Sequence, residues 1–167
     1  MPRYLHRFVA LAGSLAVLVA AAAAVAADIT RIPIPNSNFP ISQAVRVPAG
    51  VETIYFSGIT PPLIKQQGTK PDAYGGSTTD QATAAFDRLG EALKAQGLDF
   101  GNVVSLRVYL VADPAKDNKM DFLGFQTAYI KYFGTDTQPN KPARTTVEVA
   151  GLASPGALVE IEATAAR

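Results

Sequence analysis

The sequence predicts an α+β fold in which one mixed β-sheet is covered on one face by two helices. Two stretches space their apolar residues as one face of a helix does, and a glycine follows each stretch. The other regular stretches are short, rich in β-branched residues or alternating in polarity, as strands are. Their order is strand, strand, helix, strand, helix, strand, strand, and 167 residues suit one domain.

The first part of this domain contains an arm, two strands and a long loop. Residues 28–40 are rich in Pro and Asn, which predicts an extended arm. Residues 42–47 and 51–56 are predicted strands, separated by a turn at 48–50. Residues 58–76 hold several Gly and Pro residues, and a loop of this length is either functional or a plain solvated connection.

Residues 78–96 form the clearest predicted helix. Ser77, Thr78 or Thr79 can cap its N-terminus, and Gly97 supplies a left-handed stop. Its apolar face consists of Ala82, Ala85, Phe86, Leu89 and Leu93. This face is expected to pack on the sheet.

The next strand, residues 103–111, alternates between apolar and polar side chains, which predicts one buried face. The sheet face turned away from the helices must be either exposed to solvent or covered by another subunit. The residues expected on or near this face are Arg107, Tyr109, Glu148 and the two glutamates of the last strand, Glu160 and Glu162.

A second helix is predicted at residues 120–133, with Asn118 near its cap and Gly134 closing it. Its broad aromatic stripe is typical of a core. Residues 145–150 and 158–164 are the last predicted strands.

Composition excludes several kinds of chemistry. There is no Cys, and the single His is His6, which lies in a predicted leader. The predicted mature chain therefore has no Ser-His-Asp triad, no Cys nucleophile and no His/Cys metal site. The acids are dispersed and no glycine-rich phosphate-binding motif occurs, so neither a metal nor a cofactor is expected.

Residues 1–27 are predicted to be a secretory signal peptide. Arg3 and Arg7 precede an uncharged run rich in Ala, Leu and Val that ends in small residues. Cleavage would leave residues 28–167 exported to the periplasm; an uncleaved membrane anchor is the less favoured alternative.

The predicted mature chain is close to neutral. Without Arg3 and Arg7 it has 13 basic and 14 acidic residues, a net charge of about −1. No basic field is available for a nucleic acid, and no membrane contact is expected after cleavage of the leader.

Two types of side chain could carry chemistry. Arg144 follows Pro142-Ala143 at the beginning of a predicted strand, and its planar guanidinium could bind a carboxylate at two points, although a surface salt bridge is the simpler interpretation. Glu160 or Glu162 could assist a proton transfer, or could be solvated strand residues, and alternation alone does not choose between them.

The run PARTTVEVAGLASPGALVEIEATA at residues 142–165 resembles the signature of the Rid family, which comprises YjgF-type enamine/imine deaminases also labelled L-PSP endoribonucleases. The resemblance extends to residues 39–44, 55–58 and 81–98, and to parts of the second helix that include Tyr129. It covers nearly all of the predicted mature chain.

The resemblance implies a chorismate-mutase-like fold in a homotrimer with sites between subunits. It implies that Arg144 binds the substrate carboxylate and that Glu160, rather than Glu162, assists an attacking water. The remaining pocket positions that it implies are Ser57, Gly58, Gln126, Thr146 and Ile41. Some of them depart from the family pattern, because Ile41 replaces a frequent Tyr, Gln126 an Asn and Thr146 a small thiol.

The resulting hypothesis is an exported hydrolase that deaminates reactive 2-imino or enamino acids to 2-oxo acids and ammonia, similar to 2-iminobutanoate/2-iminopropanoate deaminase. The alternative is a non-catalytic trimer that binds a small carboxylate or a protein partner. A ribonuclease is disfavoured by the neutral charge and the missing His.

Overall fold

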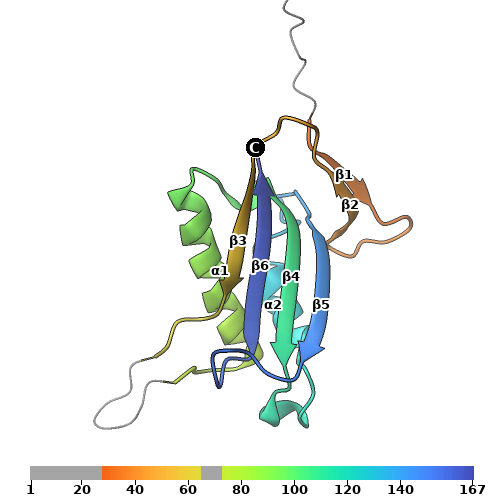
Figure 1. Ribbon diagram of the computed structural model, residues 1–167. Coiled ribbons are helices and arrows are strands. Elements are labelled where there is room, and N and C mark those ends of the chain that lie inside the picture. The colour runs from red at the N-terminus through yellow and green to blue at the C-terminus, as the bar shows by residue number, and fades with distance from the viewer. Residues whose placement is uncertain (1–27, 65–72) are drawn as a thin grey trace, which may run out of the picture.

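The computed structural model of the chain describes residues 28–64 and 73–167 (Figure 1). The predicted leader, residues 1–27, lies outside the described residues, as does the stretch 65–72 of the predicted long loop. The described ends of that loop meet, because Ile64 N donates to Ala73 O at 2.8 Å. Within the described ranges, no helix is long and apolar enough to cross a membrane.

Six strands form one mixed sheet in the order β1-β2-β5-β4-β6-β3. The strands are β1 (Thr30–Pro33), β2 (Ser42–Arg46), β3 (Thr53–Ile59), β4 (Val103–Val111), β5 (Ala143–Val149) and β6 (Val159–Ala166). Strand β4 lies between β5, to which it is parallel, and β6, to which it is antiparallel. Strand β2 joins β5 at a single register pair, Ser42 with Ala143, so the β1–β2 hairpin diverges from the rest of the sheet.

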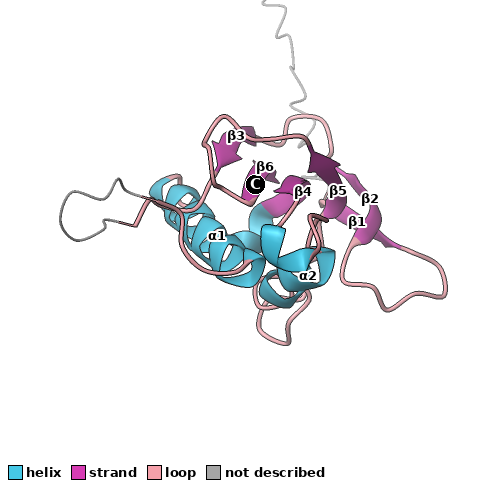
Figure 2. Cartoon of the chain, turned by 90° about the horizontal axis from the view of Figure 1, so that it is seen from below, coloured by secondary structure: helices cyan, strands magenta, loops and turns pink. Residues whose placement is uncertain are grey.

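Two helices cover the same face of the sheet, as Figure 2 shows. They are α1 (Thr78–Ala95) and α2 (Phe122–Tyr129). Ser77 is the cap of α1: its hydroxyl accepts from Asp80 N, and its own backbone N donates to Asp80 Oδ2. This reciprocal pair satisfies two backbone donors at the beginning of the helix. The predicted α+β fold with two helices on one face is confirmed.

The core lies between these helices and the sheet. The alternating side chains of β4 that were expected to be buried, Leu106, Val108 and Leu110, are at most 1% exposed. They pack with apolar residues of β6 and with an aromatic cluster that consists of Phe86, Phe100, Phe125, Tyr129, Tyr132 and Phe133. The apolar face predicted for the first helix is therefore in the core, and so are Phe125, Tyr129 and Phe133 of the second predicted helix.

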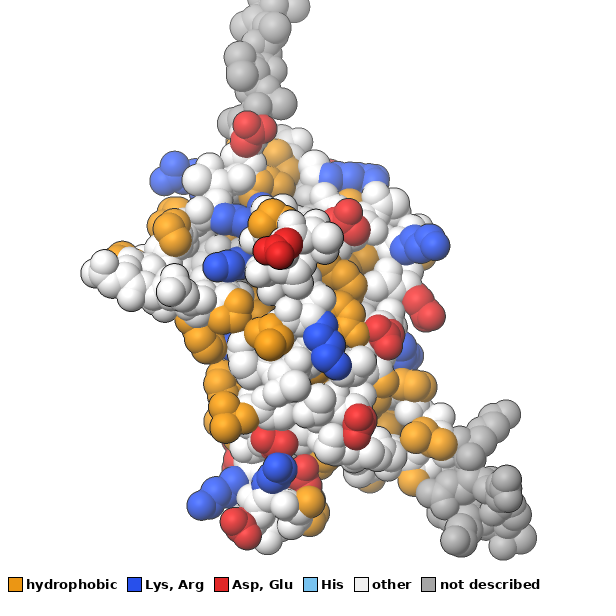
Figure 3. Space-filling model, turned by 180° about the vertical axis from the view of Figure 1, so that it is seen from behind, with side chains coloured by type: hydrophobic (Ala, Val, Ile, Leu, Met, Phe, Trp, Pro, Cys, Tyr) orange, Lys and Arg blue, Asp and Glu red, His pale blue; other side chains and the backbone are white. Residues whose placement is uncertain are grey.

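Figure 3 shows the helix-covered side, where hydrophobic side chains remain exposed among charged ones. Leu123 and Ile130, both on or just after α2, are 75% and 50% exposed. The burial of α2 is therefore uneven around its axis.

Three expectations differ from the structure. The predicted extended arm contains β1, which pairs antiparallel with β2. Helix α2 is shorter than residues 120–133, and its cap is Asp121 rather than Asn118. Asp113 N donates to Lys119 O at 3.0 Å, and this closed turn holds Asn118 at a positive φ of 54°, outside the helix.

Glu148 was expected on the face turned away from the helices, and this expectation is wrong. It lies opposite Leu110, whose side chain is buried on the helix side, and Glu148 Oε2 accepts from Met120 N at 2.7 Å. The alternation along β5 therefore runs opposite to the phase that was assumed for Glu148.

Candidate functional site

Arg144 is the second residue of β5 and faces the helices. It lies opposite Leu106 of β4 in the parallel pair, and directly opposed residues share a face of a sheet. Leu106 is buried against the helices. The guanidinium therefore extends toward α2, next to the point where β2 diverges from β5.

Four aromatic rings surround the Arg144 guanidinium. The distances from Cζ to the ring centroids are 4.2 Å for Tyr129, 5.3 Å for Phe125, 5.4 Å for Phe39 and 5.8 Å for Phe122. Burial lowers the pKa of Arg144 below its ordinary value, while the ring faces attract its positive charge. Such an arrangement keeps the guanidinium in one place without consuming its N–H donors.

Arg144 makes one side-chain hydrogen bond among the described residues: Nη1 donates to Gln126 Oε1 at 3.0 Å. Three of its five N–H donors lie on other nitrogens and are therefore free for a ligand. Next to it is a groove of about 570 Å³, lined by Ile41, Ala143, Thr145 and further residues of β2 and β4. Arg144 is one of the residues that line this groove, whereas Ala143 and Thr145 belong to the face of β5 that is turned away from the helices.

Thr146 lies on the same face as Arg144, two residues along β5. Its Oγ1 is buried and has no hydrogen-bond partner within the described part of the chain. A buried hydroxyl without a partner is unfavourable in the protein alone. Arg144, Gln126, Thr146 and Ile41 thus form one group, which we call the arginine side.

Glu160 lies on the opposite face of the sheet. It pairs in register with Tyr109 of β4, three residues from Leu106, so its side chain points away from the helices. Gly58 of β3 lies against it: a Cβ placed on Gly58 would overlap Glu160 Oε1 and would lie 2.7 Å from its Cδ. The missing side chain of Gly58 leaves the space that this carboxylate occupies.

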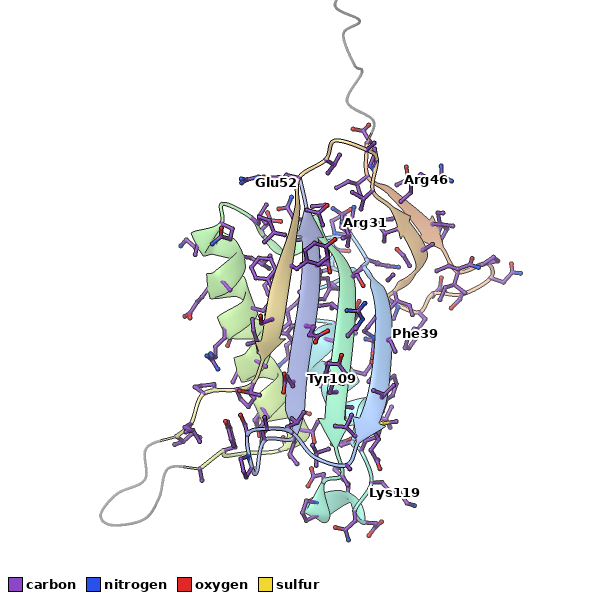
Figure 4. All side chains as sticks on the ribbon, in the orientation of Figure 1. Arg31, Phe39, Arg46, Glu52, Tyr109 and Lys119 are labelled. Atoms are coloured by element: carbon purple, nitrogen blue, oxygen red, sulfur yellow. The ribbon has the colours of Figure 1, made fainter. Side chains whose placement is uncertain are left out.

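Ser57 shares this face and lines a hollow of about 220 Å³ together with Arg107 and Glu162. Figure 4 shows Tyr109 on β4, in the middle of the same face. Glu160, Gly58 and Ser57 form a second group, which we call the glutamate side. The predicted site residues are therefore divided between the two faces of one sheet.

Glu160 and Glu162, which alternation could not distinguish, differ in their contacts. Glu162 Oε2 accepts from Arg107 Nη1 at 3.3 Å and from Tyr109 Oη at 3.2 Å. For Glu160, no side-chain hydrogen bond is found in the described ranges. Glu160 is thus the glutamate whose oxygens remain available.

The aromatic rings around Arg144 are the feature that sequence reasoning did not assign to the site. Phe122, Phe125 and Tyr129 follow one another at helical spacing and were assigned to the core. Phe125 and Tyr129 do belong to the core, but one side of each ring faces Arg144. The sequence signal that could have indicated this contact is Arg144, a cation predicted at the beginning of a strand that follows the aromatic helix.

No metal centre is apparent in the described ranges, because they contain no cluster of three or more His, Asp or Glu side chains that could hold an ion. The chemistry available at the two groups is that of a guanidinium, an amide, hydroxyls and a carboxylate.

Comparison with known proteins places this geometry in context. Residues 33–167 match the family described as Endoribonuclease L-PSP. The 2-iminobutanoate/2-iminopropanoate deaminase of Mus musculus is 40% identical over 134 residues, which is 78% of this chain and 84% of that protein.

Solved structures share the fold. E. coli TdcF with bound serine has a TM-score of 0.52 at 26% identity, covering 83% of this chain and 97% of that chain. A Rid family protein of unknown function from Yersinia pestis, YyfB, has a TM-score of 0.61 at 22% identity, covering 82% and 98%.

Proposed function

Because the chain belongs to the Endoribonuclease L-PSP family, we propose that it is a Rid-type hydrolase that converts 2-imino or enamino acids to 2-oxo acids and ammonia. The observation that carries the proposal is the Arg144 guanidinium, held by four rings and Gln126 beside an open groove. Relatives named as imine deaminases support the reaction, and the site chemistry is consistent with it.

Arg144 binds the substrate carboxylate. A guanidinium matches a carboxylate with two parallel hydrogen bonds, and its free N–H donors allow this arrangement. The bound serine of TdcF, a small amino acid with a carboxylate, supports this class of ligand. The aromatic rings fix the guanidinium, so little side-chain freedom is lost when the substrate binds.

Glu160 assists the attacking water. The water oxygen forms a bond to the imine carbon while Glu160 accepts a proton from the water. As the C=N π electrons move to the nitrogen, this proton passes to the nitrogen and a carbinolamine forms. The remaining hydroxyl proton then passes to the same nitrogen while the C–N bond breaks and the C=O of the 2-oxo acid forms, so that ammonia leaves. A C=N carbon is already electrophilic, so orientation and charge control suffice without a covalent intermediate.

The site is formed between two copies of the chain in a homotrimer. Arg144 and Glu160 lie on opposite faces of the same sheet, so one chain cannot direct both at one substrate. A neighbouring copy that places its glutamate side against the arginine side would complete the pocket. A cyclic trimer provides three such sites by symmetry.

Mixing two inactive variants tests both the reaction and the shared site. Arg144→Ala and Glu160→Gln should each abolish ammonia release from a 2-imino acid generated enzymatically in the assay. After the two variants are unfolded and refolded together, random assembly should restore roughly a quarter of wild-type activity, since each site needs one intact residue from each neighbour. A wild-type protein that releases no ammonia above background would refute the reaction, and mixtures that stay inactive would refute the shared site.

A non-catalytic carboxylate-binding trimer is the second candidate. It is favoured by Ile41, an apolar side chain beside Arg144 where the family often has a tyrosine. Thermal-shift measurements with 2-oxo acids and short carboxylates separate the two, because stabilisation without turnover supports binding alone.

Export to the periplasm completes the proposal and rests on the sequence of residues 1–27. Intact-mass measurement of the protein from a periplasmic fraction tests it. A measured mass that corresponds to a chain beginning near residue 28 supports cleavage. A mass of the full-length chain, found in the cytoplasmic fraction, contradicts both cleavage and export.

A further inference from the structure

The loop between β1 and β2 places an aromatic ring at the proposed site. Phe39 lies in this loop, and its ring centroid is 5.4 Å from Arg144 Cζ, although 39% of the side chain is exposed. The other three rings around the guanidinium come from α2, where Phe125 and Tyr129 are fully buried. Phe39 therefore keeps apolar surface that a ligand bound to Arg144 can cover.

This apolar surface continues along the hairpin. Ile34 and Ile41 line the groove of about 570 Å³ beside Arg144. Phe39 lines an adjoining hollow of about 300 Å³, and Ile34 and Ile41 line that hollow as well. The two spaces thus share an apolar boundary, which we call the hairpin wall and which consists of Ile34, Phe39 and Ile41.

Several polar residues of the groove are directed away from the hairpin wall or are already bonded. Ser105 and Arg107 alternate with Leu106 along β4, so they lie on the sheet face turned away from the helices. The Ser42 hydroxyl donates at 2.6 Å to a main-chain oxygen of the loop before β5. Gln43 is exposed, so its amide stays in contact with solvent. On the side of the groove where Arg144 lies, the hairpin wall is therefore the apolar surface that a substrate side chain can cover.

The proposed reaction restricts where that side chain can lie. A 2-imino acid is planar around its C=N carbon, and water attacks this carbon from above or below the plane. The glutamate side of the neighbouring copy must therefore face the plane, while the substrate side chain lies within it, beside the bound carboxylate. Gln126 meets Arg144 from α2. A side chain that extends away from α2 meets the hairpin wall.

We propose that Phe39 and Ile41 are specificity-determining residues that select 2-imino acids with an aliphatic side chain over those with a hydroxylated one. The inference rests on the proposed function for the reaction and names the substrate class. Each methylene group that is buried on the hairpin wall contributes about fourfold in affinity. A hydroxyl in the same place loses its contacts with water, and the three side chains of the wall offer it no hydrogen bond.

The test measures binding of 2-oxo acids to the assembled protein by isothermal titration calorimetry. Two probes, 2-oxobutanoate and 3-hydroxypyruvate, are of similar size and differ by a methyl group in place of a hydroxyl. We expect 2-oxobutanoate to bind about tenfold more tightly than 3-hydroxypyruvate. We expect 2-oxopentanoate, which is one methylene longer, to bind about fourfold more tightly again.

Variants of the hairpin wall test the assignment. Phe39→Ala and Ile41→Thr should each bring both affinity ratios several-fold closer to one. Leu123→Ala, at a residue of α2 that is 75% exposed, is the matched control and should leave both ratios unchanged. The ratios are informative even if Phe39→Ala loosens Arg144, because a weaker grip on the carboxylate lowers the affinity for every probe alike.

Four results would overturn the inference. They are binding of 3-hydroxypyruvate by wild type at least as tight as that of 2-oxobutanoate, ratios that stay unchanged in both wall variants, and no binding of any 2-oxo acid at millimolar concentration. The fourth is tightest binding by 2-oxoglutarate, which would mean that Lys141 in the adjoining hollow recruits a second carboxylate.

Binding needs no turnover, so this inference and the proposed function can fail separately. Flat affinity ratios beside ammonia release would refute the specificity and leave the reaction standing. The expected ratios without ammonia release would refute the reaction, and the hairpin wall would then select ligands for a carboxylate-binding protein.

Discussion

Gly58 and Glu160 are in contact across β3 and β6, and the glycine leaves the space in which the glutamate's carboxylate lies. The contact falls where the β3–β6 register shifts, between Phe56 and Ile59. A bulge at this point lets the backbone of one strand approach a side chain of the other. Because of this contact, any side chain introduced at Gly58 would displace the Glu160 carboxylate.

Gly58→Ala is expected to lower kcat by about tenfold or more, because the added methyl group would displace the Glu160 carboxylate by an ångström or so. Steady-state rates of ammonia release measure the effect. Gly151→Ala is the matched control, since a Cβ at Gly151 meets nothing within 4 Å. Equal rates for Gly58→Ala and wild type would show that the position of this carboxylate does not matter.

Arg144→Lys is expected to reduce kcat/KM by at least about 100-fold. A lysine keeps the charge but loses the planar fork that binds a carboxylate at two points. Arg46→Lys, at an exposed arginine of β2 (Figure 4), is the control and should retain wild-type activity. Circular dichroism checks that both variants are folded, and near-normal activity in Arg144→Lys would contradict bidentate binding.

Thr146→Val should stabilise the protein by roughly 1 kcal/mol, because it replaces a buried hydroxyl that lacks a partner by a methyl group of similar size. Thermal unfolding measures this gain. Thr145→Val, at the adjacent exposed threonine on the other face of β5, should leave stability nearly unchanged. A loss of stability in Thr146→Val would mean that the hydroxyl has a partner in the assembled protein.

Helix α1 should lose part of its capping in acid. Hydrogen bonds from Ser77 hold the pKa of Asp80 below its ordinary value of 3.8. Because the folded pKa is the lower one, the stabilisation is complete above about pH 4 and is lost as the pH falls through the folded pKa. Asp80→Asn should therefore lower Tm by a few degrees at pH 7, and the difference from wild type should shrink near pH 3.

Asp136→Asn, at an exposed aspartate, is the control for charge alone. A difference for Asp80→Asn that stays constant between the two pH values would exclude a role for the ionised carboxylate in the cap.

The sequence predicts the helices and the central strands because their patterns are local. The alternation in β4 places Leu106 and Tyr109 on the faces where the structure has them, and the turn residues around α1 define its ends. β1 escapes prediction because residues 30–33 become a strand only by pairing with β2. Helix α2 ends at Tyr129, and the residues after it form tighter turns in which Lys131 N and Tyr132 N donate to Ala128 O and Tyr129 O.

The site residues follow from the Rid resemblance, but their arrangement does not. Arg144 and Glu160 each occupy a strand, and only the register of β5, β4 and β6 reveals that they face opposite ways. The rings around Arg144 come from α2 and from Phe39, far apart in the sequence, and meet only in the folded chain. Tertiary packing, not spacing along the chain, determines these relationships.

The ring of Tyr129 against Arg144 makes the site visible by optical spectroscopy. The sequence has no Trp and only six Tyr residues, so tyrosine signals are not masked by indole absorption or emission. Tyr129 is fully buried among Phe125 and Phe133, and an aromatic ring packed in this way contributes to near-ultraviolet circular dichroism. A carboxylate that binds Arg144 changes the charge 4.2 Å from this ring, so occupancy can be followed without a label.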